Sequence, residues 1–189
     1  MRDHLNRHDV QAAFVGDGDA WHGLVALARE LGLDDRVEFT GRVSDEDVAR
    51  YLSTADVCLA PDPKNPLNDV STMNKIVEYM AMSRPLVSFD LAEARVSAGD
   101  AAVYATPNDE REFARLVVEL LDDPGRRARM GAIGRARVER DLSWEHSRRD
   151  LLAAYDALLA RGGSLRSRMS PPARFPHAAP IQAEDEPAA

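Results

Sequence analysis

The chain has 189 residues, enough for one ordinary domain and a tail, and a formal net charge of -8. The negative charge argues against nucleic acid or an anionic membrane as the main partner. A single cysteine, Cys58, excludes an intrachain disulfide and a cysteine-based zinc cluster, and no apolar run approaches the roughly 20 residues that cross a bilayer.

Apolar strands and amphipathic helices alternate through the first third of the chain. Asp19 is placed to cap the first helix and Gly32 to end it. Ser44 opens the next helix with a Ser-x-x-acid capping pattern. The expected elements are strands at 10–15, 37–39 and 56–60, a helix at 20–31 and a helix that begins after Ser44 and carries apolar residues as far as Ala55.

The stretch from Asn68 to Asp90 organises the rest of the chain. Its sequence predicts a polar loop, a short helix, a tight turn and a buried strand at 86–89. We expect Ser71 or Thr72 to cap the helix, because a hydroxyl there can accept from free N–H groups of the first turn. Pro85 stops the helix, since proline cannot extend it.

The second half of the chain continues the same alternation. After the strand at 86–89 we expect a loop from Asp90 to Asp100 with one helical turn near Glu93. The further expected elements are a strand at 101–104 and helices at 110–121, from Asp123 onward and from Ser143 to about Ala160. Residues 162–189 are rich in proline and poor in large apolar residues, so we expect a disordered tail.

Strands that alternate with helices predict an α/β fold, with a doubly wound, Rossmann-like parallel sheet covered on both faces. We assign it to residues 1–161. Ligands of such sheets bind at the carboxyl ends of the strands. The loops at Gly16, at Gly41 and from Pro61 to Met73 all lie at that edge, which places a site beside the central stretch.

The start of the helix in the central stretch is the candidate site. A helix start presents unpaired N–H groups and a positive dipole end, which suits a phosphate. Lys75 adds a cation in the first turn, and Glu78 lies one turn further on the same side, where it could hold two hydroxyls of a sugar. The competing interpretation is a solvated surface pair of Lys75 and Glu78 without function.

From about Val10 to Leu159 the segments together resemble the C-terminal, nucleotide-sugar-binding domain of the retaining glycosyltransferases of family four. Those enzymes have two Rossmann-like domains with the active site between them. The segments that carry the resemblance are Phe14-Val15-Gly16-Asp17-Gly18, Val37 to Val43, Ala55-Asp56-Val57, Lys75 to Ala81 and Pro85-Leu86-Val87.

The resemblance implies a sugar transfer from a nucleotide-diphosphate donor to an acceptor that the sequence does not identify, with no metal and no other cofactor. It also implies roles for individual residues. Arg42 and Val43 would meet the base, and Glu78 would hold the ribose hydroxyls. From its place in the first turn of the helix, we expect Lys75 to stabilise the leaving diphosphate as the catalytic residue, together with the helix start. The helix start that would bind the diphosphate comprises Ser71, Thr72, Met73, Asn74 and Lys75.

The sequence also departs from the family pattern. The family carries two glutamates separated by seven residues, and Val70 stands at the first position. Either neighbouring Asp69 takes over the contact to the donor sugar, or the chain belongs to a branch that handles the sugar differently. Measured against the family pattern, we expect the acceptor-binding N-terminal domain and the opening strand and helix of the donor domain to be missing from these 189 residues. We expect a cytoplasmic protein, which could associate with the inner membrane through such a missing domain.

Three interpretations follow for the chain. The first is the donor-binding part of a glycosyltransferase. The second is a catalytically incomplete module that binds a nucleotide sugar and needs a separate acceptor domain. The third is a different doubly wound protein, such as a phosphate-binding regulator or an epimerase-like sugar enzyme.

Overall fold

The computed structural model describes residue 5 and residues 7–165, with side chains to residue 160. By its contacts the chain divides into two compact units, Met1–Trp144 and Glu145–Ala189, which are treated separately below. Within the described residues, no helix is both long enough and apolar enough to pass through a lipid bilayer. Of the tail expected at 162–189, residues 166–189 lie outside the described part.

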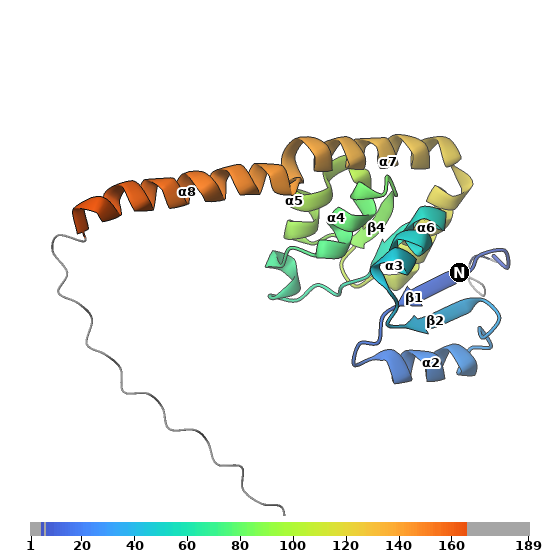
Figure 1. Cartoon of the computed structure of the whole chain (residues 1–189). Coiled ribbons are helices and arrows are strands. Elements are labelled where there is room, and N and C mark those ends of the chain that lie inside the picture. The colour runs from blue at the N-terminus through green and yellow to red at the C-terminus, as the bar shows by residue number, and fades with distance from the viewer. Residues whose placement is uncertain (1–4, 6, 166–189) are drawn as a thin grey trace, which may run out of the picture. The chain divides into compact units, whose positions relative to one another are not determined.

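The described residues form two separate parallel sheets (Figure 1). One pairs β1 (Ala12–Val15) with β2 (Val37–Gly41), and the other has the order β3 (Cys58–Ala60), β4 (Leu86–Phe89), β5 (Ala102–Ala105). Parallel neighbours need a crossover connection, and the helices between the strands supply it. The α/β class and the Rossmann-like alternation are therefore confirmed, whereas the expected single sheet is divided in two.

The helices follow the strands in the expected order. They are α2 (Trp21–Glu30), α3 (Asp45–Thr54), α4 (Asn74–Ala81), α5 (Ala92–Ala98), α6 (Glu110–Asp122), α7 (Pro124–Arg137) and α8 (Trp144–Leu165), with short turns η1 (Asn68–Val70), η2 (Gly99–Ala101) and η3 (Val138–Leu142). The predicted cap of α3 is confirmed, because Ser44 Oγ accepts from the Asp47 N–H at 3.2 Å.

The predictions for α2 and α5 were wrong. Helix α2 is preceded by Ala20 and has no side-chain cap, so Asp19 does not cap it. The segment expected as a loop with one turn near Glu93 forms helix α5. Its first N–H, that of Ala92, donates at 2.9 Å to the Asp69 carboxylate, a cap supplied from 23 residues away. Local pattern cannot reveal a cap that the tertiary fold brings in from another segment.

The core lies around the three-stranded sheet. All four residues of β4 are buried, as parallel strands covered on both faces should be. Ile76 and Met80 of α4 are buried there with Leu120 of α6, and the rings of Phe89 and Phe113 lie 5.0 Å apart. Cys58 belongs to the same buried cluster, as the sequence indicated.

Helix α8 forms the described part of the second unit (Figure 1). It was expected to end near Ala160, but its backbone continues through Gly162 and Gly163 to Leu165. Apolar residues recur along it at one-turn spacing, which is typical of an amphipathic helix. These residues are Leu151, Leu152, Tyr155, Leu158 and Leu159.

Candidate functional site

Hydrogen bonds connect the loops that follow β3, β4 and β5 to one another. Asn108, after β5, accepts the Lys64 backbone N–H with its side-chain oxygen at 2.7 Å. The Lys64 ammonium donates to the Asp90 carbonyl at 3.3 Å. Since these loops leave the carboxyl ends of neighbouring parallel strands, they form the sheet edge at which doubly wound folds bind ligands.

Helix α4 begins at this edge without a side-chain cap. Its N-cap residue is Met73, and neither predicted capping hydroxyl serves it. The Ser71 hydroxyl donates to the Leu67 carbonyl at 2.7 Å, and the Thr72 hydroxyl donates to Glu93 at 2.9 Å. The prediction that one of them caps α4 was therefore wrong. An uncapped helix start leaves its first N–H groups for water or for an anion.

Lys75 lies in the first turn of α4, as predicted, and forms an ion pair with Asp62 of the preceding loop. Its ammonium lies 2.7 Å from a carboxylate oxygen of Asp62. The Lys75 side chain is 35% exposed and that of Asp62 19%, so the pair is partly shielded from water. The interpretation of Lys75 and Glu78 as a surface ion pair was wrong, because Lys75 pairs with Asp62 instead.

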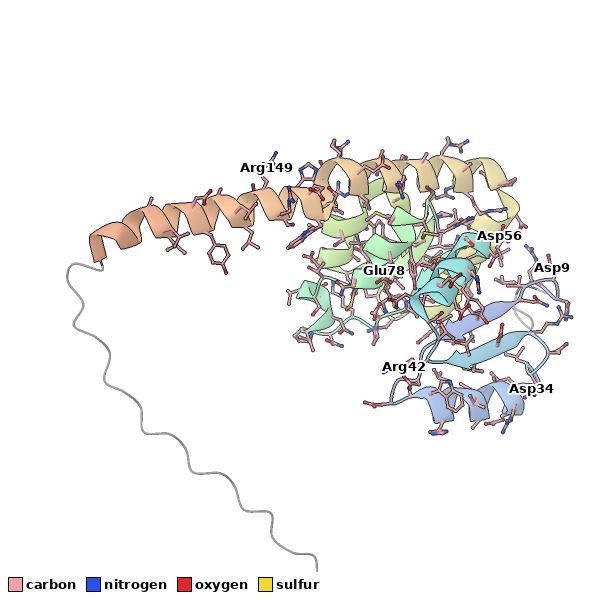
Figure 2. All side chains as sticks on the ribbon, in the orientation of Figure 1. Asp9, Asp34, Arg42, Asp56, Glu78 and Arg149 are labelled. Carbon is pink, nitrogen blue, oxygen red and sulfur yellow. The ribbon has the colours of Figure 1, made fainter. Side chains whose placement is uncertain are left out.

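Glu78 lies one turn further along α4 (Figure 2). The residue is exposed, and among the described residues its carboxylate has no hydrogen bond or ion pair. Such a carboxylate is available to accept hydrogen bonds from a hydroxylated ligand. The assignment of Glu78 to ribose hydroxyls stays a prediction.

Asp69 is engaged at the same edge. One carboxylate oxygen accepts the Ala92 N–H and lies 3.2 Å from the Lys64 ammonium. The Ala92 N–H, with a smaller contribution from Lys64, holds the pKa of the Asp69 carboxyl below its usual range. These bonds assign Asp69 a structural role as the cap of α5, and its contact with a donor sugar stays a prediction.

Arg42 and Val43 follow β2 and therefore belong to the other sheet. The Arg42 side chain is 84% exposed and its guanidinium lies 3.6 Å from Asp17 (Figure 2). Val43 is half-buried. The structure thus brings the segment from Asp69 to Glu78 together on one edge, while no described bond ties Arg42 to it.

Glu93 was not singled out from the sequence and is a central acceptor of this edge. It accepts from the Thr72 hydroxyl at 2.9 Å and from the Ser97 hydroxyl at 3.4 Å. Its position in the sequence could have identified Glu93, because this carboxylate lies three residues beyond Asp90, just after a buried strand. Glu93 holds the residue before Met73 in place and so helps to fix the approach to α4.

Charge at this edge is unbalanced. Carboxylates outnumber cations among the side chains of the loops and helix starts described above, and Asp90 is itself paired with Arg95. A bound diphosphate would therefore meet few free positive groups beyond the α4 N-terminus. Among the described residues, no group of three metal-ligating side chains occurs, and the expectation that no metal is required stays a prediction.

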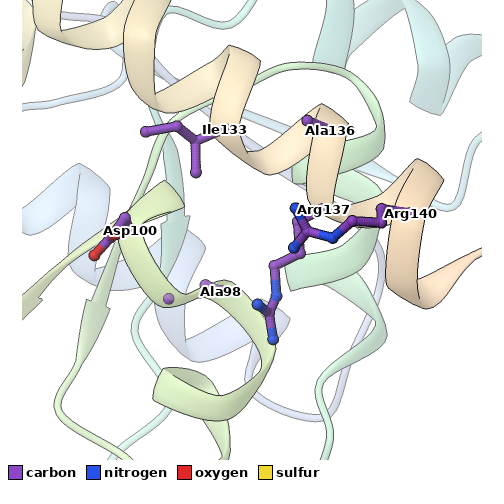
Figure 3. Close-up of a pocket in the computed structure, with 7 residues that line it drawn as sticks. Ala98, Asp100, Ile133, Ala136, Arg137 and Arg140 are labelled. Atoms are coloured by element: carbon purple, nitrogen blue, oxygen red, sulfur yellow. The ribbon is translucent and has the colours of Figure 1, made fainter.

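A surface hollow lies away from this edge. It has a volume of about 340 Å³ and is lined by Ala98, Asp100, Ile133 and Arg137 (Figure 3). These residues come from the end of α5, from η2 before β5 and from α7, so the hollow lies at the amino end of β5. The Arg137 guanidinium is already bonded to the carbonyls of Val96 and Ser97. The hollow is therefore not part of the candidate site.

The fold and the edge define a Rossmann-like half of the GT-B type of glycosyltransferase fold. The model of the family described as glycosyl transferases group 1 matches residues 1–123, and the chain belongs to this family.

Curated relatives are identical to this chain at about a third of the aligned positions. The chain is 33% identical over 142 residues to the GDP-mannose-dependent monoacylated alpha-(1-6)-phosphatidylinositol monomannoside mannosyltransferase of Corynebacterium glutamicum, covering 74% of this chain and 37% of that protein. It is 35% identical over 124 residues to the alpha-D-kanosaminyltransferase of Streptomyces kanamyceticus, covering 65% and 31%. The chain thus spans about a third of the length of these relatives.

Solved structures show the same fold. Sucrose-phosphate synthase from Thermosynechococcus elongatus matches with a TM-score of 0.70 and 26% identity, over 80% of this chain and 39% of that one. Anabaena HepE in complex with UDP matches with a TM-score of 0.66 and 21% identity, over 80% and 42%, which supports the fold alone.

Proposed function

We propose that this chain binds a nucleotide-diphosphate sugar and forms the donor-binding part of a glycosyltransferase. The observation that carries the proposal is the uncapped start of α4 with Lys75 in its first turn and Glu78 one turn on. Membership of the group 1 glycosyl transferases and the mannosyltransferase named above support it. Acceptor binding and the transfer step are proposed for a longer assembly of which this chain is one part, because the chain spans only about a third of the length of its relatives.

In this proposal the donor lies along the carboxyl edge of the three-stranded sheet. The backbone N–H groups of Thr72, Met73 and Asn74 meet the diphosphate, together with the positive end of the α4 dipole. Glu78 accepts the two ribose hydroxyls. Arg42 and Val43, after β2, face the base.

Transfer breaks the bond between the sugar C1 and the diphosphate oxygen, and negative charge grows on that oxygen. Groups fixed before the reaction stabilise such charge without reorganising, which is where most of the rate gain arises. The α4 N–H groups and the Lys75 ammonium are the fixed groups here. Asp62 holds Lys75 in this position through the bond of 2.7 Å.

Calorimetric titration of the full chain with UDP and with GDP tests donor binding. In Glu78→Gln, binding should weaken by about tenfold, since a hydrogen bond to a charged group is worth roughly 1.5–3 kcal/mol. The matched control is Glu30→Gln, an exposed glutamate at the end of α2. Binding that is equal in wild type and Glu78→Gln would contradict the assignment of Glu78.

Turnover distinguishes the enzyme from the incomplete module. Release or transfer of the sugar from UDP-glucose or GDP-mannose by the chain itself would support an active enzyme. Binding without turnover would support a module that needs an acceptor domain. A folded chain that binds neither nucleotide would favour the third interpretation, a doubly wound protein of another kind.

A further inference from the structure

Helix α7 lies across α4 and α5 (Figure 1), and three of its arginines donate to the carbonyl ends of other helices. Arg127 bonds to the end of α6, Arg135 to the end of α4 and Arg137 to the end of α5. The last carbonyls of a helix have no partner within it and carry the negative end of its dipole, so cations are favourable there. Since α7 contains no acidic residue, its arginines are available to bond to its neighbours.

The bond from Arg135 completes the termination of α4. Two backbone N–H groups of the following turn, those of Ser83 and Arg84, donate back to carbonyls of α4 at 2.9 Å. Ser83 has a φ of 56°, the left-handed conformation that this way of ending a helix requires. Neither N–H uses the Ala81 carbonyl, and the Arg135 guanidinium donates to that carbonyl at 2.5 Å. Arg135 therefore supplies a bond that the turn does not provide.

The backbone of α7 also approaches this end of α4 closely. A Cβ at Gly131 would lie 2.1 Å from the Ser83 carbonyl oxygen, and a Cβ at Gly134 would lie 2.9 Å from Cγ of Met80. Met80 is fully buried, so this contact belongs to the core. Close-packed interiors transmit a displacement rather than absorb it. Helix α7 thus holds the end of α4 by close packing and by the bond from Arg135.

Helix α4 is short, so a displacement at one end reaches the other. It runs from Asn74 to Ala81, which corresponds to a length of about 12 Å. Glu78 lies one turn before the end that α7 holds, and Lys75 lies in the first turn, where it pairs with Asp62. A shift or tilt of α4 at α7 would therefore move both side chains and the free N–H groups of the first turn.

We propose that Arg135 is a positioning residue of the donor site. It holds α4 at the carbonyl end and thereby sets the place of Lys75, Glu78 and the first N–H groups. Its guanidinium is directed by a second bond, from Nε to Glu139 at 2.6 Å. Arg135 acts through α4 and does not touch the donor. The inference rests on the proposed function, because it assumes that these groups bind a nucleotide diphosphate.

Calorimetric titration of the full chain with UDP and with GDP tests this role. Arg135→Gln removes the cation from the Ala81 carbonyl, and we expect binding about tenfold weaker, since small displacements of binding groups are costly. The matched control is Arg127→Gln, which removes bonds of the same kind, from the same helix, to the end of α6. Because α6 carries no residue of the candidate site, binding in this control should stay within about twofold of wild type. Arg135→Lys keeps a cationic donor at the end of α4 and should restore most of the affinity.

A double variant separates positioning from a general loss of stability. If Arg135 positions Glu78, Arg135→Gln should weaken binding much less in a Glu78→Gln background than in wild type, because coupled residues give non-additive changes. A chain that is merely less stable would lose affinity by the same factor in both backgrounds.

Amide hydrogen exchange without nucleotide measures the hold of α7 on α4 directly. In Arg135→Gln, exchange at Met82 and Ser83 should be about tenfold faster than in wild type, while the amides of α6 change little. In Arg127→Gln the amides at the end of α6 should exchange faster and those of α4 should not. This measurement does not depend on donor binding.

The inference is overturned alone if wild type binds nucleotide but Arg135→Gln binds it equally well, or if Arg127→Gln weakens binding as much as Arg135→Gln does. Losses that multiply in the double variant, or unchanged exchange at Met82 and Ser83, would also overturn it. A wild-type chain that binds neither nucleotide would instead overturn the donor site, and the donor role of Arg135 with it, whatever the exchange shows.

Discussion

The Lys75 ammonium and the Asp62 carboxylate, 2.7 Å apart, join the first turn of α4 to the loop after β3. The pair positions a cation beside an uncapped helix start and at the same time cancels its charge. A bound diphosphate would compete with Asp62 for the same ammonium. In the proposed site, the pair would therefore set both the place and the strength of anion binding.

Asp62→Asn should strengthen nucleotide binding. The change frees Lys75 and removes one negative charge, and an ion pair of this exposure is worth at most about 1 kcal/mol. We expect UDP or GDP to bind roughly threefold more tightly, by calorimetry at constant ionic strength. Lys75→Gln should have the opposite effect. Weaker binding in Asp62→Asn would mean that positioning of Lys75 by Asp62 outweighs its neutralisation.

Gly131→Ala should destabilise the first unit. A Cβ at Gly131 in α7 would lie 2.1 Å from the Ser83 carbonyl oxygen, in a turn where Ser83 has a φ of 56°. A backbone carbonyl cannot move aside as a flexible side chain can. We therefore expect a loss of about 1–3 kcal/mol in the free energy of unfolding, measured in urea.

Gly125→Ala is the matched control in the same helix. The nearest atoms to its added Cβ lie at 3.4 Å, which leaves room for a methyl group. Alanine favours helix over glycine, so the expected change is a gain of roughly 0.5–1 kcal/mol. Equal effects of the two substitutions would contradict the close approach of α7 to Ser83.

Asp69→Asn should lower stability in a manner that depends on pH. The folded-state pKa of Asp69 lies below its ordinary value of 3.8, mainly because of the Ala92 N–H. A depressed pKa contributes stability that is fully present above the ordinary value and is lost as pH falls through the folded value. The gap in Tm between wild type and Asp69→Asn should thus be constant near neutrality and shrink below pH 3.8.

Asp19→Asn provides the comparison for that experiment. Asp19 is an exposed loop residue that does not cap α2, so its substitution should leave the Tm close to that of wild type. If the gap between wild type and Asp69→Asn persists unchanged at acid pH, the charge of Asp69 is not what stabilises α5.

Cys58 should resist thiol reagents in the folded protein. Burial, opposed in part by the Arg84 charge, raises the pKa of its thiol from 9.0 to about 12. At pH 8 almost no thiolate is present, and the thiolate is the reactive form. Labelling with iodoacetamide, followed by mass spectrometry, should be complete in denaturant and negligible without it. Rapid labelling of the folded chain would place Cys58 outside the core.

Much of the fold could be predicted from the sequence because its signals are local. The periodicity of apolar side chains distinguishes strands from amphipathic helices. This periodicity correctly predicts the strands, most helices and the α/β class. The Ser44 cap was predictable because donor and acceptor lie three residues apart. Lys75 in the first turn of α4, and the exposed Glu78 one turn later, follow from the same short-range geometry.

Only the tertiary structure decided the contacts that join distant segments. Asp69 caps α5 from 23 residues away, Glu93 takes the hydroxyl of the expected cap Thr72, and Asp62 pairs with Lys75. These partners meet because parallel strands bring the loops at their carboxyl ends to one edge, whatever their separation along the chain.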